Sequence, residues 1–220
     1  MKPADTRIPP DTEVRLSKWD ADDKDIIGKE KSDARERLDE YRARLEALQE
    51  LLYAEGRHKL LIVLQAMDTA GKDSTIRHVF QGIDPMGVNV VRFKSPTPAE
   101  LAHDYLWRVH PHVPGAGEIA IFNRSHYEDV LVVRVHPELL EHQRLPAEVR
   151  GPKVWKRRYR EINDWERYLV DNGFRIVKLF LNLSREEQRQ RFLARIDEPE
   201  KNWKFSSSDA KEREHWDEYQ

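Results

Sequence analysis

Apolar positions along this chain form short continuous runs that alternate with longer amphipathic stretches. Four runs are rich in branched or aromatic residues, as in strands buried on both faces: 60–64, 88–93, 118–123 and 174–181. Between and after them, apolar residues recur every three or four positions, which predicts helices over 72–80, 98–109, 148–170 and 184–195, and again from 208. This alternation predicts an α/β fold with a mostly parallel, doubly wound sheet.

A further helix is predicted ahead of the first strand, over residues 32–53. Its apolar residues follow a 3-4-3-4 spacing: Leu38, Tyr41, Leu45, Leu48 and Leu52. Two heptads are short for a coiled coil, so we expect this face to pack on the core. Residues 1–31 are polar and proline-bearing, which predicts an extended or partly disordered arm. We therefore divide the chain into an N-terminal arm and helix over 1–55 and a core over 56–220.

Composition adds few constraints. The chain carries 38 basic and 40 acidic residues, for a formal charge of −2, so a preference for anions must come from local clusters of cations. The absence of cysteine excludes disulfide and thiolate chemistry and fits a cytoplasmic protein. No signal-peptide core and no apolar run of membrane length occur, so we expect a soluble protein without membrane association. A doubly wound sheet would normally add a fifth strand after 208, which leaves a C-terminal truncation open.

The first strand runs into a loop that resembles a phosphate-binding loop. The pattern G-x-x-x-x-G-K-[ST] is matched imperfectly, because Ala66 replaces the first glycine and Asp73 replaces the hydroxyl residue. An ordinary turn with a solvated lysine is the alternative. A buried strand before the loop and an amphipathic helix after it favour the phosphate cradle. The residues expected to bind phosphate there are Ala70, Gly71, Lys72, Asp73 and Ser74.

Acidic residues follow the first and third strands, whose carboxyl ends should meet at one edge of the sheet. Asp68 lies in the loop itself, and Glu128 and Asp129 come one short turn after Asn123, the end of the third strand. A carboxylate beside a phosphate repels it unless the carboxylate acts through a metal or orients a second group. We therefore predict that Asp68, Glu128 and Asp129 bind Mg²⁺, with Mn²⁺ as an alternative. The other interpretation is that Glu128 and Asp129 are the solvated start of a helix.

Basic residues cluster at the starts of two predicted helices. The first cluster is Arg150, Lys153, Lys156, Arg157, Arg158 and Arg160, and the second is Arg185, Arg189, Arg191 and Arg195. Cations at the beginning of a helix oppose its dipole, so a bound polyanion would stabilise them. Nucleic acid and inorganic phosphate polymer both remain candidates, and a solvated face is the alternative.

Three motifs in order resemble the family-2 polyphosphate kinases. They are LQAMDTAGKDS at 64–74, FNRSHYEDV at 122–130 and KNWKF at 201–205, and the likeness extends from about residue 35 to the end. The resemblance implies a thymidylate-kinase-like P-loop fold, a three-layer sandwich with a helical lid at about 185–215. It also implies magnesium-dependent phosphoryl transfer between inorganic polyphosphate and nucleotides. Asn123 stands where much of the family has aspartate, and Glu128 where it has asparagine. This version of the motif resembles the subgroup that accepts both nucleoside mono- and diphosphates.

The resemblance also implies roles for individual residues. The implied catalytic residues are Asp68, Lys72, Arg124, Glu128 and Asp129. Further implied phosphate-binding residues are Arg124, Arg134, Lys153, Arg157, Arg158, Arg191, Arg195 and Lys204, and the implied nucleotide-binding residues are Ser95, Thr97 and Asn123. The expected partners are polyphosphate, adenine or guanine nucleotides and a second copy of the chain in a dimer or tetramer, without nucleic acid.

Two rival functions are compatible with the same loop. An ATP-dependent nucleoside monophosphate kinase would need a purine-binding surface near the lid but no basic helix at 150–160. A non-catalytic P-loop regulator or nucleic-acid binder would tolerate the loss of Asp68, Glu128 and Asp129, whereas an enzyme would not.

Overall fold

The computed structural model describes residues 6–23 and 31–220. Four parallel strands form one sheet in the order β2-β3-β1-β4. Their bounds are β1 Lys59–Ala66, β2 Val88–Arg92, β3 Ile119–Asn123 and β4 Phe174–Leu181. The predicted strands and the α/β parallel fold are thus confirmed, and each strand lies within about two residues of its expected bounds.

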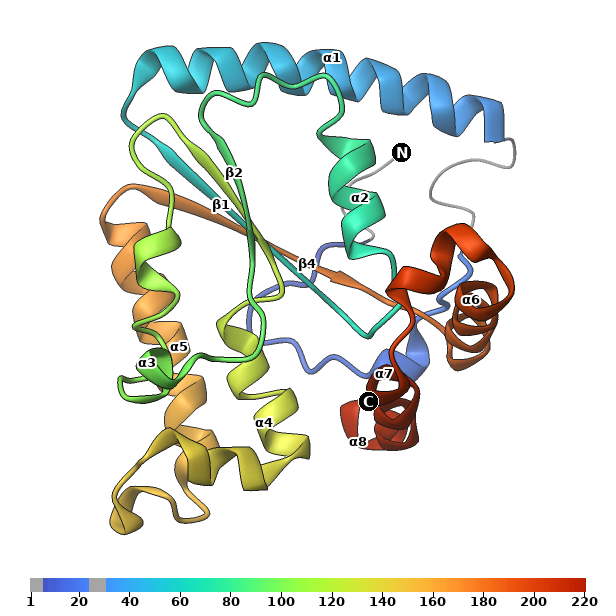
Figure 1. Ribbon diagram of the computed structural model, residues 1–220. Coiled ribbons are helices and arrows are strands. Elements are labelled where there is room, and N and C mark those ends of the chain that lie inside the picture. Colours follow the sequence, from blue (N-terminus) through green and yellow to red (C-terminus); the bar gives the residue numbers. More distant parts are fainter. Residues whose placement is uncertain (1–5, 24–30) are drawn as a thin grey trace.

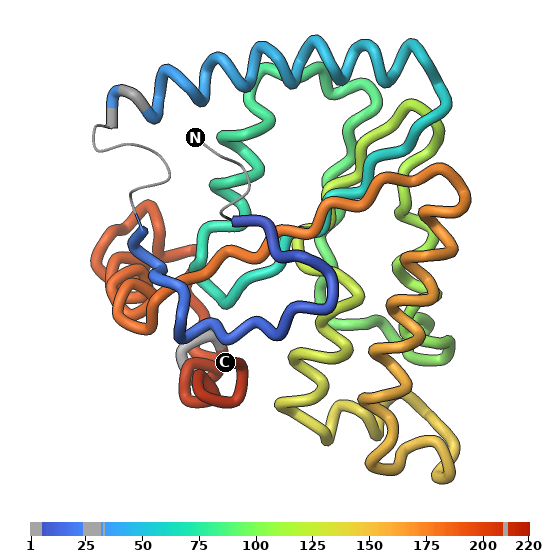
Figure 2. Tube along the Cα trace, turned by 180° about the vertical axis from the view of Figure 1, so that it is seen from behind, coloured from blue at the N-terminus to red at the C-terminus, as the bar shows by residue number. Residues whose placement is uncertain are grey.

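Helices lie on both sides of this sheet. The α-helices are α1 Lys31–Glu55, α2 Lys72–Val79, α3 Pro98–Leu101, α4 Val132–Val135, α5 Val154–Asp171, α6 Arg185–Asp197, α7 Ser207–Glu212 and α8 Trp216–Tyr219. In both views α2 and α5 lie on opposite sides of the strands (Figures 1 and 2). Short 3-10 helices include η4 at His126–Asp129 and η7 at Pro199–Lys204. The segment from α6 onward gathers beyond the end of β4, where the helical lid was expected (Figure 1).

Strand register places the chemistry at one edge. Asn123 pairs with Leu64 of β1 on one side and with Arg92 of β2 on the other. The loops that follow β1, β2 and β3 therefore leave the sheet side by side. Both central strands are enclosed: β3 is buried along its whole length and Leu61 of β1 is fully buried. A rigid apolar centre thus holds the three loops in fixed positions.

Helix α1 crosses the top of the molecule in Figure 1 and ends beside the start of β1. It is fastened to the α2–β2 region by two hydrogen bonds, from Gln49 Nε2 to the Met86 carbonyl (2.8 Å) and from Arg42 Nε to the His78 carbonyl (2.6 Å). Its predicted packing face is partly wrong. Tyr41 and Leu48 are about half exposed, whereas the polar Gln49 is buried. The face of α1 that contacts the core is rotated relative to the predicted apolar face, because the contact includes these two polar hydrogen bonds. The spacing of apolar residues carries no information about such bonds.

Two predicted helices begin or end elsewhere than expected. The helix that starts at Thr97 ends after Leu101, because Asp104 Oδ1 accepts hydrogen bonds from the backbone of Leu106 and Trp107 and closes a turn. Helix α5 begins at Val154 and not at 148, because Gly151 and Pro152 disfavour helix before it.

Within the described residues, no helix combines the length and the apolar character needed to cross a membrane.

Candidate active site

The loop after β1 has the shape of a phosphate cradle. Thr69 and Gly71 adopt left-handed backbone conformations, with φ of 67° and 97°, and α2 begins immediately afterwards at Lys72. Lys72 Nζ donates to the carbonyls of Ala66 (2.7 Å) and Met67 (3.3 Å), so its side chain lies across the loop. Burial lowers the pKa of Lys72, and nearby Arg124 lowers it further. A desolvated cation at a helix start is well placed to attract an anion.

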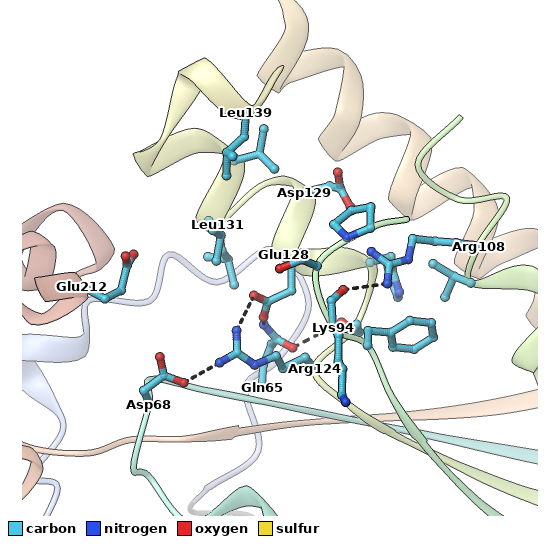
Figure 3. Close-up of a pocket in the computed structure, with 18 of the residues that line it drawn as sticks. Gln65, Asp68, Lys94, Arg108, Arg124, Glu128, Asp129, Leu131, Leu139 and Glu212 are labelled. Atoms are coloured by element: carbon cyan, nitrogen blue, oxygen red, sulfur yellow. Dashed lines mark hydrogen bonds and ion pairs between the residues drawn. The ribbon is translucent and has the colours of Figure 1, made fainter. Parts of the chain in front are cut away.

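Arg124 connects the two loops that carry the acidic residues. It follows the last residue of β3 with φ of 65°, and its Nη2 lies 2.5 Å from Asp68 Oδ1. Its Nη1 lies 3.3 Å from Glu128 Oε2, while Glu128 Oε1 accepts a hydrogen bond from Gln65 Nε2 at 2.6 Å (Figure 3). The structure thus brings Asp68, Arg124 and Glu128 together, as the sequence predicted.

A cavity of about 690 Å³ opens in front of this group. Gln65, Asp68, Arg124 and Glu128 form its polar end, and Lys94 and Arg108 add cations (Figure 3). The cavity also has an apolar wall, made by Leu101, Val109, Leu131, Val132 and Leu139. Ser95 lines it as predicted, whereas the Thr97 hydroxyl caps α3 by accepting from the Glu100 amide at 3.3 Å. Glu212 and Tyr219 enter from the C-terminal segment. The volume and the mixed lining are typical of a site for a nucleotide-sized ligand.

Asp73 binds the ends of two strands. Its Oδ1 accepts a hydrogen bond from Asn123 Nδ2 at 2.6 Å, and its Oδ2 lies 2.5 Å from Arg92 Nη2. Burial acts to raise the pKa of Asp73, but the bonds from Arg92 and Asn123 outweigh it and keep that pKa below its usual value. Asp73 was predicted to bind phosphate, whereas here its two oxygens are already engaged in holding Asn123 and the end of β2.

Helix α6 packs directly on the cradle. Gln188, which is buried, donates from Nε2 to the Asp68 carbonyl at 3.2 Å, and Arg191 Nη1 donates to the Thr69 carbonyl at 3.0 Å. A Cβ on Gly71 would lie 3.4 Å from the same Arg191 nitrogen. Arg191 thus lies against the phosphate loop, and its predicted role in binding phosphate stays a prediction. Gln188 was missed, because an amide within a charged helix has no distinguishing pattern in the sequence.

The family model for Polyphosphate kinase 2 (PPK2) matches residues 28–220. The chain belongs to this family. An ADP-polyphosphate phosphotransferase of Rhodopseudomonas palustris is 50% identical over 220 residues, with 100% of this chain and 76% of the relative covered. An AMP/ADP-polyphosphate phosphotransferase of Meiothermus ruber is 53% identical over 214 residues, with 97% and 76% covered. The crystal structure of Polyphosphate Kinase 2 from Arthrobacter aurescens TC1 superposes with a TM-score of 0.86 at 42% identity, covering 97% of this chain and 72% of that one.

Within this polyphosphate kinase 2 fold, Asp129 and Arg158 are partners in the interior. Asp129 is buried at the edge of the cavity, and its carboxylate points away from that of Glu128 (Figure 3). Its Oδ1 accepts from Gln143 Nε2, at the end of the 3-10 helix Pro137–Gln143, at 2.8 Å. Arg158, expected on a basic surface, is 2% exposed, donates from Nη1 to the Asp129 carbonyl (2.8 Å) and packs its guanidinium over the Tyr105 ring (4.7 Å). The prediction that Arg158 binds a polymer is corrected, because its side chain is buried. Asp129 bonds to Gln143 and lies 3.7 Å from Arg158 while it also lines the cavity, and its role toward a metal stays a prediction.

The other cations predicted to bind phosphate are spread along the surface. Arg134 donates to the Tyr159 hydroxyl (2.5 Å), Arg157 donates to the Val149 carbonyl (2.6 Å), and Arg195 donates to the Lys204 carbonyl (3.1 Å). The exposed members of the first basic cluster are Arg150, Lys153, Lys156 and Arg160, and Ser74 is exposed on the first turn of α2. A polymer could contact these exposed cations, whereas it could not reach Arg158.

The position of Asp129 leads to a prediction. Burial raises the pKa of Asp129 to about 6 despite the neighbouring Arg158. Because the folded protein then binds a proton more readily than the unfolded chain, the contribution of Asp129 to stability is lost as pH rises from about 4 to 6. Asp129→Asn should flatten the change of unfolding free energy over that range relative to the parent. It should also keep activity within a few-fold at pH 7; a loss comparable to that of Glu128→Gln would contradict the internal role.

The donor set permits one small divalent cation. Among residues 6–23 and 31–220, no group of three or more His, Asp or Glu side chains is placed to hold a metal ion. Asp68 and Glu128 are two carboxylates at the polar end of the cavity, and both pair with Arg124. One or two carboxylates match Mg²⁺, which keeps several waters and takes further oxygens from substrate phosphates.

Proposed function

We propose that this protein transfers phosphoryl groups between inorganic polyphosphate and nucleotides, and that AMP and ADP are both acceptors. The observation that carries the proposal is Arg124 held between Asp68 and Glu128, beside a phosphate cradle and at the end of a nucleotide-sized cavity. Two relatives at least 50% identical are named as polyphosphate phosphotransferases, one for ADP and one for AMP and ADP. We further propose a cytoplasmic enzyme.

The site contains what this reaction requires. A nucleotide phosphate is already an anionic nucleophile, so no general base is needed. The protein must instead bring two polyanions together and neutralise them while the phosphoryl group moves. Lys72 would bind the transferring phosphate at the cradle, Arg124 would bind it from the β3 side, and Arg191 would approach it from the lid.

We propose that Asp68 and Glu128 hold Mg²⁺, with Mn²⁺ as a substitute. The ion would neutralise charge on the phosphates and would separate the two carboxylates from the substrate. The apolar wall of the cavity suits the nucleoside of the acceptor, which includes guanine as well as adenine nucleotides in this proposal. The exposed cations Arg150, Lys153, Lys156 and Arg160 suit a longer anion outside the cavity.

The acceptor range is tested by adding AMP or ADP to the purified protein with polyphosphate and Mg²⁺, in the absence of ATP. We expect ADP from AMP and ATP from ADP, and neither product when Mg²⁺ is chelated. Phosphorylation of AMP by ATP but not by polyphosphate would instead favour an ATP-dependent monophosphate kinase. Sedimentation of the same sample tests the proposed dimer or tetramer.

Acceptor choice should depend on Asn123. AMP is one phosphate shorter than ADP, so a site that uses both must shift the nucleotide or the metal to keep the reacting atoms roughly 3–3.5 Å apart. An aspartate at position 123 would place a second carboxylate next to Asp73 Oδ1, now 2.6 Å from Asn123 Nδ2, and repulsion would displace one of them.

We therefore expect Asn123→Asp, alone and with Glu128→Asn, to change the ratio of AMP to ADP rates several-fold under saturating polyphosphate and Mg²⁺. The parent and the Glu128→Asn single variant are the comparison. Rates that all fall by one common factor would show that acceptor choice is set elsewhere, in the lid or around Ser95.

A further inference from the structure

A charged cluster connects the active-site turn, residues 124–129, to α5 and β4. Its centre is Glu166 of α5, whose Oε1 accepts a hydrogen bond from the Tyr127 hydroxyl at 2.7 Å. Glu166 Oε2 lies 2.7 Å from Lys178 Nζ of β4, and the same Nζ donates to the Tyr127 hydroxyl at 3.0 Å. The three side chains form a closed triangle that joins α5 and β4 to the segment after β3.

His126 lies on top of this triangle and is fully buried. Its Nε2 is 3.5 Å from Glu166 Oε1, and neither ring nitrogen has a closer polar partner among the described residues. The imidazole is packed between the rings of Tyr127 and Trp165, with centroids 4.6 and 4.7 Å away. Burial acts to raise the pKa of Glu166, but the nearby His126 ring and the hydrogen bonds from Lys178 and Tyr127 outweigh it and hold the pKa at about 2. Glu166 is therefore an ionised group in a well-packed interior.

The cluster acts on the segment that carries Arg124 and Glu128. Tyr127 lies between them in η4, and its amide donates to Ser125 Oγ at 3.2 Å, which closes the turn. On the front side, Gln65 fastens the turn to β1 through Ser125 (3.4 Å) and Glu128 (2.6 Å). On the back side, the Tyr127–Glu166 bond supplies the attachment to α5. The turn is thus held from both faces, while Arg124 itself adopts a left-handed backbone conformation.

We propose that Glu166 and Lys178 are positioning residues for phosphoryl transfer. They hold the Tyr127 hydroxyl and thereby fix the positions of Arg124 and Glu128. This inference rests on the proposed function, because it assigns the cluster to the same active site. Stability alone is a weak reason for the cluster, since a partly buried ion pair often contributes little compared with apolar packing. Because the hydrogen bonds of the cluster end on Tyr127, between Arg124 and Glu128, they can restrain the positions of both active-site side chains.

The test compares Tyr127→Phe, Glu166→Gln and the double variant with the parent. Tyr127→Phe removes one oxygen and keeps the packed ring, so it is the variant that preserves the fold most closely. Asp164→Asn is the matched control, because Asp164 lies on the same helix, is half exposed and pairs only with surface arginines (Arg167 at 3.0 Å and Arg160 at 4.0 Å) in the described structure. For each protein, kcat, the KM for nucleotide and for polyphosphate, and Tm are measured.

We expect Tyr127→Phe and Glu166→Gln each to lower kcat by about 10- to 100-fold while both KM values stay within a few-fold, because a small displacement of reacting groups affects the transition state most. The double variant should be no slower than the slower single variant, since both break one connection. Asp164→Asn should match the parent.

A parent-like kcat in Tyr127→Phe and Glu166→Gln, with or without a lower Tm, would overturn the positioning role, and so would losses that multiply in the double variant. The proposed function fails separately, through a parent that does not use polyphosphate. In that case the same variants are measured with the donor that the parent does use, and the ratio of variant to parent still decides the positioning role.

Discussion

Lys72→Ala should lower kcat by about 10²–10³ or more, with little change in Tm. Lys72 is the cation at the start of α2, and its ammonium lies across the phosphate loop on the carbonyls of Ala66 and Met67. A preorganised cation stabilises the charge that develops on the phosphoryl group during transfer. In other enzymes, removal of one such electrostatic contact lowers kcat by about 10²–10³. The change costs two hydrogen bonds to loop carbonyls, and it also removes a desolvated ammonium whose pKa burial lowers, so the two effects on stability oppose each other.

Steady-state kinetics and thermal unfolding of the same preparation check this expectation. Lys18→Ala is the control, since Lys18 is exposed in the 3-10 helix Leu16–Lys18, outside the three motifs and the cavity. It should retain parent activity. A Lys72→Ala protein that melts like the parent and keeps most of its activity would remove Lys72 from the reaction.

Arg124→Lys should cost about 10² in kcat, although the charge is conserved. The guanidinium reaches Asp68 with one nitrogen and Glu128 with another, at 2.5 and 3.3 Å. An ammonium is a single point charge and cannot hold both carboxylates and a phosphate in a planar arrangement. The backbone at this position is left-handed, and because lysine pays the same penalty there as arginine, the substitution changes the side chain without changing that strain.

Arg167→Lys, an exposed change of the same kind on α5, is the control and should leave kcat unaltered. The decisive quantity is kcat at saturating Mg²⁺ and both substrates. If Arg124→Lys retains kcat and alters only a KM, Arg124 contributes to binding in the ground state and not to the transfer step.

The parts of the site that the sequence predicted correctly are those that local pattern determines. A buried strand, a Gly-Lys pair and an amphipathic helix are contiguous, so Lys72 and Asp68 could be placed before the structure was known. Arg124 and Glu128 could be placed for a similar reason, because they follow a short apolar strand whose end must lie near that of its parallel neighbour.

Side chains whose environment depends on distant elements could not be placed in this way. Arg158 has the same sequence surroundings as the exposed Lys156, but it lies on the face of α5 that meets Asp129 and Gln143. The direction of the Arg158 side chain depends on how α5 is rotated about its axis and on the buried Asp129 that it meets. Asp129 is 29 positions away in the chain, so local sequence does not indicate the contact. Glu166 and Gln188 were missed for the same reason, since their partners lie on other strands and loops.

Polyphosphate itself should donate the phosphoryl group at the site between the cradle and Arg124. The most direct measurement is to incubate the purified protein with ³²P-labelled polyphosphate, unlabelled ADP and Mg²⁺, without added ATP, and to follow label into nucleotide. We predict labelled ATP with the parent protein and a rate lower by about 10² or more with Lys72→Ala. An unlabelled nucleotide pool, in a protein that phosphorylates AMP when ATP is supplied, would show that ATP and not polyphosphate is the donor.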